Sequence, residues 1–250
     1  MAAGARKETV KVAPDAVRVW RGFRLSHLSQ AEFFKKLGSF FIPGTVQIQL
    51  PVGLTAYLPS VLPKDKPSEA PDEIALVFYE VKQAYDDAKK TVGGRAYSDL
   101  HGLAFDLNRS MSGFPDPYKG TLVEDEKYHL FNEPVDWQHG VVKTFVGVRE
   151  RGNSFHEEVA NWLTGVQQNE GPDGAIVSAS RNFVVYWEHW SDAKMAKSSR
   201  MSELREWLKP VYEKIIEPFE LPQRLWDEYV GVEVSGGESF NFQFERGRRT

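Results

Sequence analysis

The sequence contains no cysteine, and this absence excludes several kinds of chemistry. Disulfide frameworks, thiolate nucleophiles, cysteine-ligated zinc and iron–sulfur clusters all need that residue. Long apolar runs are missing too, and none approaches the roughly 20 residues that cross a bilayer. Residues 1–7 (MAAGARK) lack the apolar stretch of a signal peptide. We therefore expect a cytoplasmic protein without a membrane partner.

Several ligand-binding motifs are also absent. No G-x-x-x-x-G-K-[ST] or G-x-G-x-x-G follows a strand, and no G-x-S-x-G elbow exists. Four of the histidines form no H-x-x-x-H or similar cluster, which disfavours a zinc or non-heme iron site built from histidine alone. The net charge is −4 and the basic tail 246–249 is short, so we expect no nucleic-acid partner. These four histidines are His27, His129, His139 and His156.

The second half of the chain repeats the layout of the first half. Residues 17–24 (VRVWRGFR) and 142–149 (VKTFVGVR) are strand-like runs that both end in Gly-x-Arg. Seven residues after each glycine comes Ser-x-x-Glu, at 29–32 and at 154–157. This spacing is typical of a capping box at the start of a helix. An internal duplication restricts the fold more than any other feature of a sequence.

A second pair of matching segments extends the repeat. Residues 75–80 (ALVFYE) correspond to 183–188 (FVVYWE), and helix-like stretches follow both. Each half therefore predicts the order strand, helix, two strands, helix, strand, which is the ferredoxin-like arrangement. In the first half we expect strands at 16–25, 53–58, 73–80 and 127–132, and helices at 30–41 and 82–108. In the second half we expect strands at 141–149, 175–180, 182–190 and 229–234, and helices at 155–168 and 192–217.

These patterns predict an α+β protein of two tandem ferredoxin-like repeats, residues 15–134 and 140–234, that form one α+β barrel. Residues 235–250 would add a further strand, near 238–245, and a basic tail. The segment 61–71 carries three prolines and mixed charges, which predicts an exposed loop inserted in the first hairpin. A lid or a subunit contact is the alternative for this loop.

A family resemblance rests on residues 183–194 (FVVYWEHWSDAK), an apolar strand followed by aromatic-Glu-x-Trp and an acidic helix start. This segment resembles the strand-to-helix signature of antibiotic-biosynthesis monooxygenase-type domains. Residues 78–85 (FYEVKQAY) resemble it less well because the tryptophan is missing. The resemblance implies the dimeric α+β barrel superfamily, with both halves of the barrel supplied by one chain and a homo-oligomer as a further possibility.

Strand alternation indicates which side chains would face the cavity of such a barrel. Trp20, Gly22 and Arg24 share one face, as do Phe145, Gly147 and Arg149. We place these faces inside the barrel and the valines of the same strands on the helix side. The cavity would then accept a small apolar or aromatic substrate. The expected substrate-binding residues are Trp20, Phe145, Tyr79, Trp187 and Trp190, and the valine face comprises Val17, Val19, Phe23, Val146 and Val148.

The candidate catalytic residues are Glu188, His189, Arg149 and Arg24. A carboxylate among aromatic rings has a raised pKa and can act as a base, and histidine moves protons near neutral pH. Either guanidinium could balance negative charge at the mouth of the cavity. Structural roles stay open for all four: a glutamate tied to a neighbouring strand, a packed histidine, and rim arginines paired with acids.

His101 is the candidate metal ligand. Its place on the second helix of the first repeat is comparable to that of the iron-ligating histidine in heme-degrading members of the resembled superfamily. The second repeat has no histidine in the matching region, 204–208 (LREWL). The sequence thus leaves three functions open: a cofactor-free oxygenase that uses Glu188 or His189 as base, a heme-dependent oxidoreductase or lyase, and a non-catalytic protein that binds small ligands.

Overall fold

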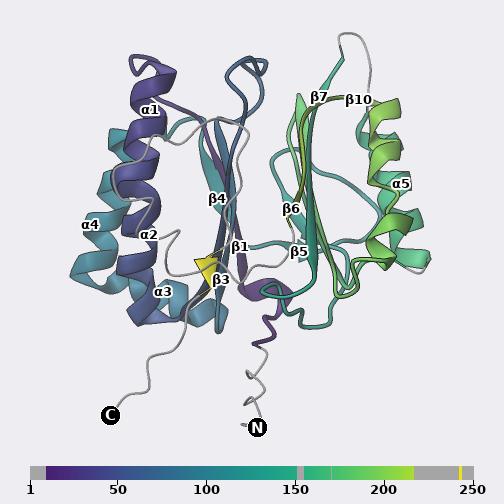
Figure 1. Cartoon of the computed structure of the whole chain (residues 1–250), viewed down its shortest axis with the longest axis horizontal. Coiled ribbons are helices and arrows are strands. Elements are labelled where there is room, and N and C mark those ends of the chain that lie inside the picture. The colour runs from purple at the N-terminus through teal and green to yellow at the C-terminus, as the bar shows by residue number, and fades with distance from the viewer. Residues whose placement is uncertain (1–9, 151–154, 170, 217–241, 244–250) are drawn as a thin grey trace, which may run out of the picture.

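The computed structural model describes residues 10–150, 155–169, 171–216 and 242–243. Two β-sheets face each other, and helices cover the outer side of each sheet (Figure 1). The first sheet has the strand order β11-β2-β3-β1-β4 and the second has β10-β7-β9-β8-β6-β5. Without the added strands, both sheets show the 4-1-3-2 order of a ferredoxin-like unit. The predicted α+β class, with two sheets of ferredoxin-like strand order, is therefore confirmed.

The first unit begins after the short turn η1 (Pro14–Ala16). Its capping box is present, because Ser29 Oγ accepts from the amide of Glu32 while the Glu32 carboxylate accepts from the amide of Ser29. Its strands are β1 (Val17–Gly22), β2 (Leu54–Val61), β3 (Glu73–Tyr79), β4 (Met111–Gly113) and β11 (Phe242–Gln243). Its helical segments are α1 (Gln30–Lys36), η2 (Leu37–Phe41), α2 (Ile42–Gln49), η3 (Leu50–Val52), α3 (Lys82–Lys90), α4 (Val92–Leu100) and η4 (His101–Leu103).

The first helix runs past the point where the sequence predicts its end. Pro43 and Gly44 indicate a stop, yet α2 continues to Gln49. The segment η2, just before Pro43, is a π-helix, whose wider turn accommodates irregular hydrogen bonding. Thr45 Oγ1 also donates to the carbonyl of Phe41 at 2.9 Å. The prediction of a helix ending at residue 41 is wrong, and the continuation supplies one wall of the cavity described below.

The second unit departs from prediction after its third strand. Its elements are β7 (Val141–Arg149), α5 (His156–Gln168), β8 (Gly174–Ala179), β9 (Phe183–Trp190), η5 (Met195–Ser198), η6 (Met201–Glu206) and β10 (Leu208–Ile216). The expected helix at 192–217 is wrong, since two short 3-10 turns and a strand occupy that range. Pro210 lies at a register shift of the edge strand β10, a position where proline costs no internal ladder bond. The predicted strand at 229–234 lies outside the described residues.

The linker between the units contributes strands to the second sheet. β6 (Lys127–His129) pairs with β8, and β5 (Asp116–Pro117) pairs with β6. A strand inside 127–132 is thus present, but the prediction that it closes the first sheet is wrong. β4 takes that place beside β1. The proposed division between residues 134 and 140 stays a prediction.

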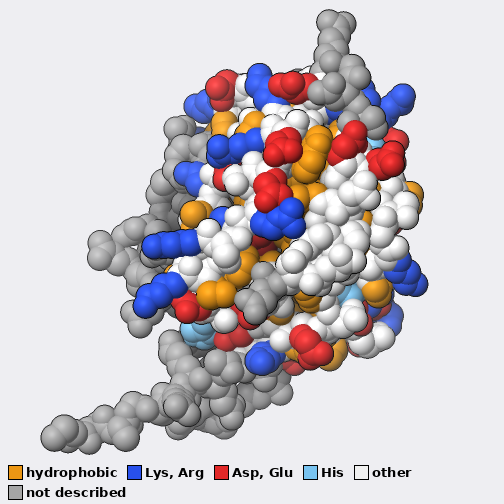
Figure 2. All heavy atoms as spheres, turned by 90° about the vertical axis from the view of Figure 1, so that its right-hand side faces the viewer, with side chains coloured by type: hydrophobic (Ala, Val, Ile, Leu, Met, Phe, Trp, Pro, Cys, Tyr) orange, Lys and Arg blue, Asp and Glu red, His pale blue; other side chains and the backbone are white. Residues whose placement is uncertain are grey.

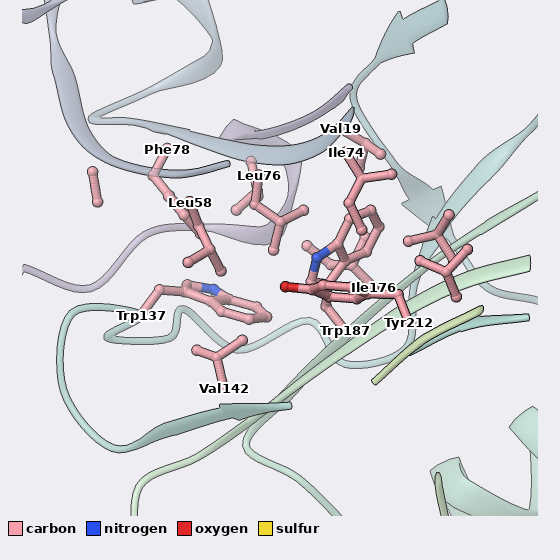
Figure 3. Packing of buried hydrophobic residues seen from close by; sticks show 14 of the residues in the cluster. Val19, Leu58, Ile74, Leu76, Phe78, Trp137, Val142, Ile176, Trp187 and Tyr212 are labelled. Atoms are coloured by element: carbon pink, nitrogen blue, oxygen red, sulfur yellow. The ribbon is translucent and has the colours of Figure 1, made fainter. Parts of the chain in front are cut away.

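Apolar side chains from both sheets pack together in the middle of the space between the sheets (Figure 3). Trp137 and Trp187 lie here among aliphatic residues from both sheets. No strand pairing among the described residues joins the two sheets into a closed barrel. The valine face of the first strands points into this core, so its predicted placement on the helix side is wrong. Members of this core from that face are Val17, Val19, Phe23, Val146 and Val148.

The loop 61–71 is anchored at both ends. Leu62 and Ala70 are fully buried, and only the tip is exposed. Lys66 Nζ lies 3.1 Å from the carboxylate of Asp72, and both side chains are less than a tenth exposed. The amide of Arg24 also donates to Asp72 at 2.8 Å. The prediction of an exposed loop therefore holds for the tip alone.

Replacing Lys66 with alanine should lower the free energy of unfolding by about 1–3 kcal/mol, because it leaves a buried carboxylate with one partner fewer. Lys64→Ala is the matched control, since Lys64 is exposed on the same loop and forms no ion pair with the described residues. Urea denaturation of both variants measures the difference. Equal stabilities would show that the Lys66–Asp72 pair contributes nothing.

The outer face of the second unit, over α5, carries acidic and basic side chains interspersed with isolated apolar ones (Figure 2). Such mixing is ordinary for a solvated surface and gives this face no single-sign field. Among the described residues, no helix is long and apolar enough to cross a membrane.

Candidate functional site

A cavity of about 450 Å³ lies on the helix side of the first sheet. This size falls within the usual range for small-molecule sites, roughly 300–1,000 Å³. The sheet forms its floor, while η2, α2, α3, α4 and η4 form its walls. Floor residues are Arg18, Trp20, Tyr57, Ala75, Val77, Tyr79 and Ser112. Wall residues are Phe41, Thr45, Gln49, Tyr85, Lys89, Gly94, Arg95, Tyr97, Ser98 and His101, and Leu107 and Ser110 complete the lining.

His101 projects into this cavity from η4. Its Nδ1 lies 3.0 Å from the carbonyl oxygen of Tyr97, so Nδ1 carries the proton and Nε2 carries the lone pair. The ring makes edge contacts with Trp20 at 5.2 Å and with Phe41 at 4.8 Å between centroids. Burial among these rings lowers the pKa of His101 to about 4. The imidazole is therefore neutral at pH 7, with a free lone pair.

A buried carboxyl group lies beneath the floor of the cavity. Trp20 Nε1 donates to Glu73 Oε2 at 3.1 Å, and the Tyr57 hydroxyl donates to Glu73 Oε1 at 3.3 Å. Glu73 is fully buried, and burial raises its pKa to about 8. The carboxyl group keeps its proton at neutral pH because the low-dielectric surroundings penalise the charged form. Glu73 thereby fixes two side chains that line the cavity.

Three tyrosine hydroxyls of the cavity, those of Tyr57, Tyr79 and Tyr97, stay protonated. Burial raises the pKa of Tyr57, Tyr79 and Tyr97 above the ordinary value. Tyr97 lies 2.5 Å from the hydroxyl of Thr45, whose own proton goes to the Phe41 carbonyl. Tyr97 is therefore the donor in that bond. The cavity offers polar hydroxyl groups at fixed places on a largely aromatic surface.

Three of the sequence-predicted residues meet in this cavity: Trp20, Tyr79 and His101. The face of β1 that carries Trp20 differs from the prediction, since Trp20 points toward the helices and not toward the second sheet. Alternation along β1 is as expected, but the assignment of the two faces is reversed. The same reversal holds for Phe145, which packs against α5 in the core of the second unit.

Glu188 and His189 lie in the second unit, away from the cavity. Glu188 is buried on the face of β9 that carries Tyr186, and its Oε1 lies 3.7 Å from Lys143 Nζ. His189 faces the inter-sheet side, with its ring 5.4 Å from that of Trp137 and its Nδ1 3.7 Å from Asp173. Burial lowers the pKa of His189. Both side chains have the surroundings expected for structural roles, and their catalytic roles stay predictions.

The two candidate arginines lie at strand ends and do not line the cavity. Arg24 Nε is 3.8 Å from Asp72, and its Nη1 donates to the carbonyl of Leu28. Arg149 is exposed at the end of β7, where its amide donates to the carbonyl of Asn182 at 2.7 Å. The remaining tryptophans are packed, Trp187 between the sheets and Trp190 against Val141 and Ala196. The chain brings none of these residues to His101.

Sequence reasoning missed Glu73, Tyr57, Tyr97, Thr45 and Arg18. Glu73 opens a strand and shares its face with Tyr79 by alternation, which is a usable signal. Thr45 lies in the helical stretch that the proline seemed to end. Tyr97 stands four residues before His101 on the same helical face, a spacing that also predicts contact. Arg18 shares a face with Trp20, two residues away.

A polynuclear or non-heme metal centre finds no support among the described residues, which contain no group of three His, Asp or Glu side chains suited to a metal ion. Heme is a different case because it needs one protein ligand and an apolar cavity. A neutral imidazole whose Nδ1–H is held by a backbone carbonyl is the usual form of a ligating histidine. His101 and the aromatic cavity fit that requirement.

Comparison with known proteins gives the fold some context and no more. No protein-family model matches the chain, and no curated protein does. Among solved structures, a "putative monooxygenase" from Fusobacterium nucleatum aligns with a TM-score of 0.38 and 10% identity, covering 85% of this chain and 98% of its own. A second "putative monooxygenase", from Lactobacillus acidophilus, aligns with a TM-score of 0.34 and 9% identity, covering 82% of this chain and 91% of its own.

A dye-decolorizing peroxidase from Bacteroides thetaiotaomicron gives a TM-score of 0.38 and 11% identity, with 86% of this chain and 96% of its own covered. Scores and identities this low carry no argument about activity. The function of this chain is therefore argued from its own cavity.

Proposed function

We propose that this chain is an oxygenase-type oxidoreductase that acts on a small aromatic substrate bound in the cavity of the first unit. The observation that carries the proposal is a neutral histidine, oriented by the Tyr97 carbonyl, inside an aromatic cavity of about 450 Å³. The oxygenase type is supported by the resemblance of residues 183–194 to the monooxygenase-type signature, of which the strand part is present as β9 and the helix part is not.

In the cofactor-free reaction, Nε2 of His101 takes a proton from an acidic C–H group of the substrate. The carbanion, delocalised over the aromatic rings, then reacts with O₂. The CH₂ group becomes a carbonyl group, and the second oxygen atom leaves as water with the two hydrogens of that group. A protonated hydroxyl such as that of Tyr79, which lines the cavity, can stabilise the anion, since donors placed at developing charge lower the barrier.

Binding of heme by His101 is the second candidate, and the fixed Nδ1–H of the neutral imidazole favours it. Heme, when bound, supplies one-electron and oxygen chemistry. Trp20 and Phe41 would then pack against the group, and the lowered pKa of His101 would keep its Nε2 unprotonated. The absorption spectrum of the purified protein decides: a Soret band supports heme, and a spectrum without one supports the cofactor-free reaction.

Closing the cavity should abolish the activity. Ser98 is exposed on α4 and lines the cavity, so Ser98→Trp places a large ring at its mouth without disturbing the core. We expect oxygen consumption with 1,8-dihydroxyanthrone, an aromatic carbon acid, to fall at least tenfold. An oxygen electrode measures the rate.

Ala96→Trp is the matched control, because Ala96 is exposed on the same helix and does not line the cavity. This variant should keep the wild-type rate. If both variants keep it, catalysis takes place elsewhere in the chain. If the wild type binds the anthrone and consumes no oxygen, a non-catalytic ligand-binding protein becomes the better description.

A further inference from the structure

Arg18 differs from the two arginines that follow it along the chain, Arg21 and Arg24. Arg21 pairs with Asp125 at 3.1 Å, and Arg24 lies 3.8 Å from Asp72. Among the described residues, no carboxylate lies within ion-pair distance of Arg18. Its Nη2 donates to Ser112 Oγ at 2.5 Å, and its guanidinium stacks 4.6 Å from the ring of Tyr85. Arg18 is thus held in place, and no carboxylate of the described residues pairs with it.

The cavity around Arg18 is positively charged. Lys89 and Arg95 also line it, and Lys89 Nζ lies 5.2 Å from the ring centre of Tyr85. None of the described residues that line the cavity is acidic. Glu73, which is hydrogen-bonded to the floor residues Trp20 and Tyr57, keeps its proton, so it does not neutralise this field. A ligand that fits here gains by carrying negative charge.

The shape of the site narrows the class of anion. A planar guanidinium binds a carboxylate through two parallel hydrogen bonds, and the contacts of Arg18 with Tyr85 and Ser112 hold its guanidinium group in place. Trp20 and Tyr79 provide aromatic surface next to it on the same floor. We propose that the cavity binds an aromatic carboxylate, with the carboxylate on Arg18 and the rings among the floor residues. The proposal rests on the proposed function for its site and adds the substrate class.

The test compares two probes of nearly equal shape. 2-Naphthoate carries a carboxylate and 2-naphthamide does not, and isothermal titration calorimetry of the heme-free full chain at pH 7 measures both. We expect the wild type to bind naphthoate at least about tenfold more tightly, as a charge-assisted hydrogen bond allows. The preference should shrink in 0.5 M NaCl because half-exposed charges are screened.

Arg18→Gln should remove the preference and leave the affinity for the amide unchanged, which also shows that the variant is folded. Arg18→Lys should keep part of the preference, since lysine retains the positive charge but lacks the two parallel N–H donors of the guanidinium group. Arg24→Gln, the control, should behave as the wild type because Arg24 does not line the cavity.

Equal binding of the two probes by the wild type overturns the carboxylate site and leaves the cavity and its proposed chemistry standing. Binding of neither probe overturns the site together with the small-molecule function. A hemin titration separates two sources of the carboxylate. If Arg18→Gln loses the naphthoate preference and keeps hemin binding, the carboxylate belongs to the substrate. If hemin affinity falls as well, Arg18 also holds carboxylates of the heme, which supports the anion site.

Discussion

Replacing His101 with alanine should lower the rate of substrate-dependent oxygen consumption by about 10²–10⁴, the usual loss when a positioned acid or base is removed. His101 is the histidine that lines the cavity, and its lowered pKa, about 4, keeps it unprotonated at pH 7. Alanine removes the proton acceptor and leaves the aromatic walls in place. An oxygen electrode, with calorimetry of naphthoate binding in parallel, separates lost chemistry from lost binding.

Three variants serve as comparisons. His27→Ala changes an exposed histidine and should keep the full rate. Glu188→Gln and His189→Ala test the earlier candidates from the second unit, and we expect folded protein of either variant to keep most of its activity. If Glu188→Gln lowers the rate of oxygen consumption and His101→Ala does not, the assignment of the site to the first unit is contradicted. If the protein carries heme, His101→Ala should instead remove the Soret band.

The tandem ferredoxin-like layout could be predicted because it depends on local patterns. Both Gly-x-Arg strands form, and the first capping box is present with both of its hydrogen bonds. Gly22 illustrates why the pattern recurs: a Cβ atom there would come within 2.4 Å of Phe105. Gly147 meets the same crowding, at 2.6 Å from the ring of Phe145. These glycines admit aromatic packing on the helix side of each sheet.

The orientation of the sheets could not be predicted, because both faces of the strands are buried. β2, β3, β8 and β9 are buried along their whole length, so no polar face marks the solvent side. Alternation then says which side chains share a face but not where that face points. Because the two faces were reversed, the sequence predicted a cavity between the sheets, whereas the cavity lies on the helix side of the first sheet. Trp20 and Tyr79 line the cavity all the same, and their role in substrate binding stays a prediction.

The wrong helix limits have separate physical causes. Pro43 is tolerated because the π-helical turn before it adapts the backbone hydrogen bonding. Helix propensities of single residues do not predict such a turn. Residues 208–216 have helix-forming side chains such as Leu208, yet they pair with β7 along the edge of the second sheet. The gain from completing the sheet outweighs a weak local preference.

Glu73→Gln should change the pH dependence of stability more than any surface substitution. In the unfolded chain Glu73 titrates near its ordinary pKa of 4.5, whereas burial raises the pKa in the folded chain to about 8. Between these values the folded state binds more protons than the unfolded state, so the free energy of unfolding falls as pH rises. Above pH 8 the loss is complete. Glutamine does not titrate, so the variant lacks this fall.

The stability of Glu73→Gln relative to the wild type should therefore rise by roughly 2–5 kcal/mol between pH 5 and pH 8, since one unit of pKa corresponds to about 1.4 kcal/mol. Urea denaturation at pH 5, 6, 7 and 8 measures the difference, and Glu124→Gln, at an exposed position, is the control. Parallel curves for Glu73→Gln and the wild type would show that Glu73 ionises at ordinary pH in the folded chain. Glutamine keeps an oxygen that accepts from Trp20 Nε1, and its NH₂ group can donate to the Tyr57 hydroxyl oxygen, so naphthoate binding should survive. Survival of binding, together with the flattened pH curve, would place the titrating proton on the carboxyl group that supports the cavity floor.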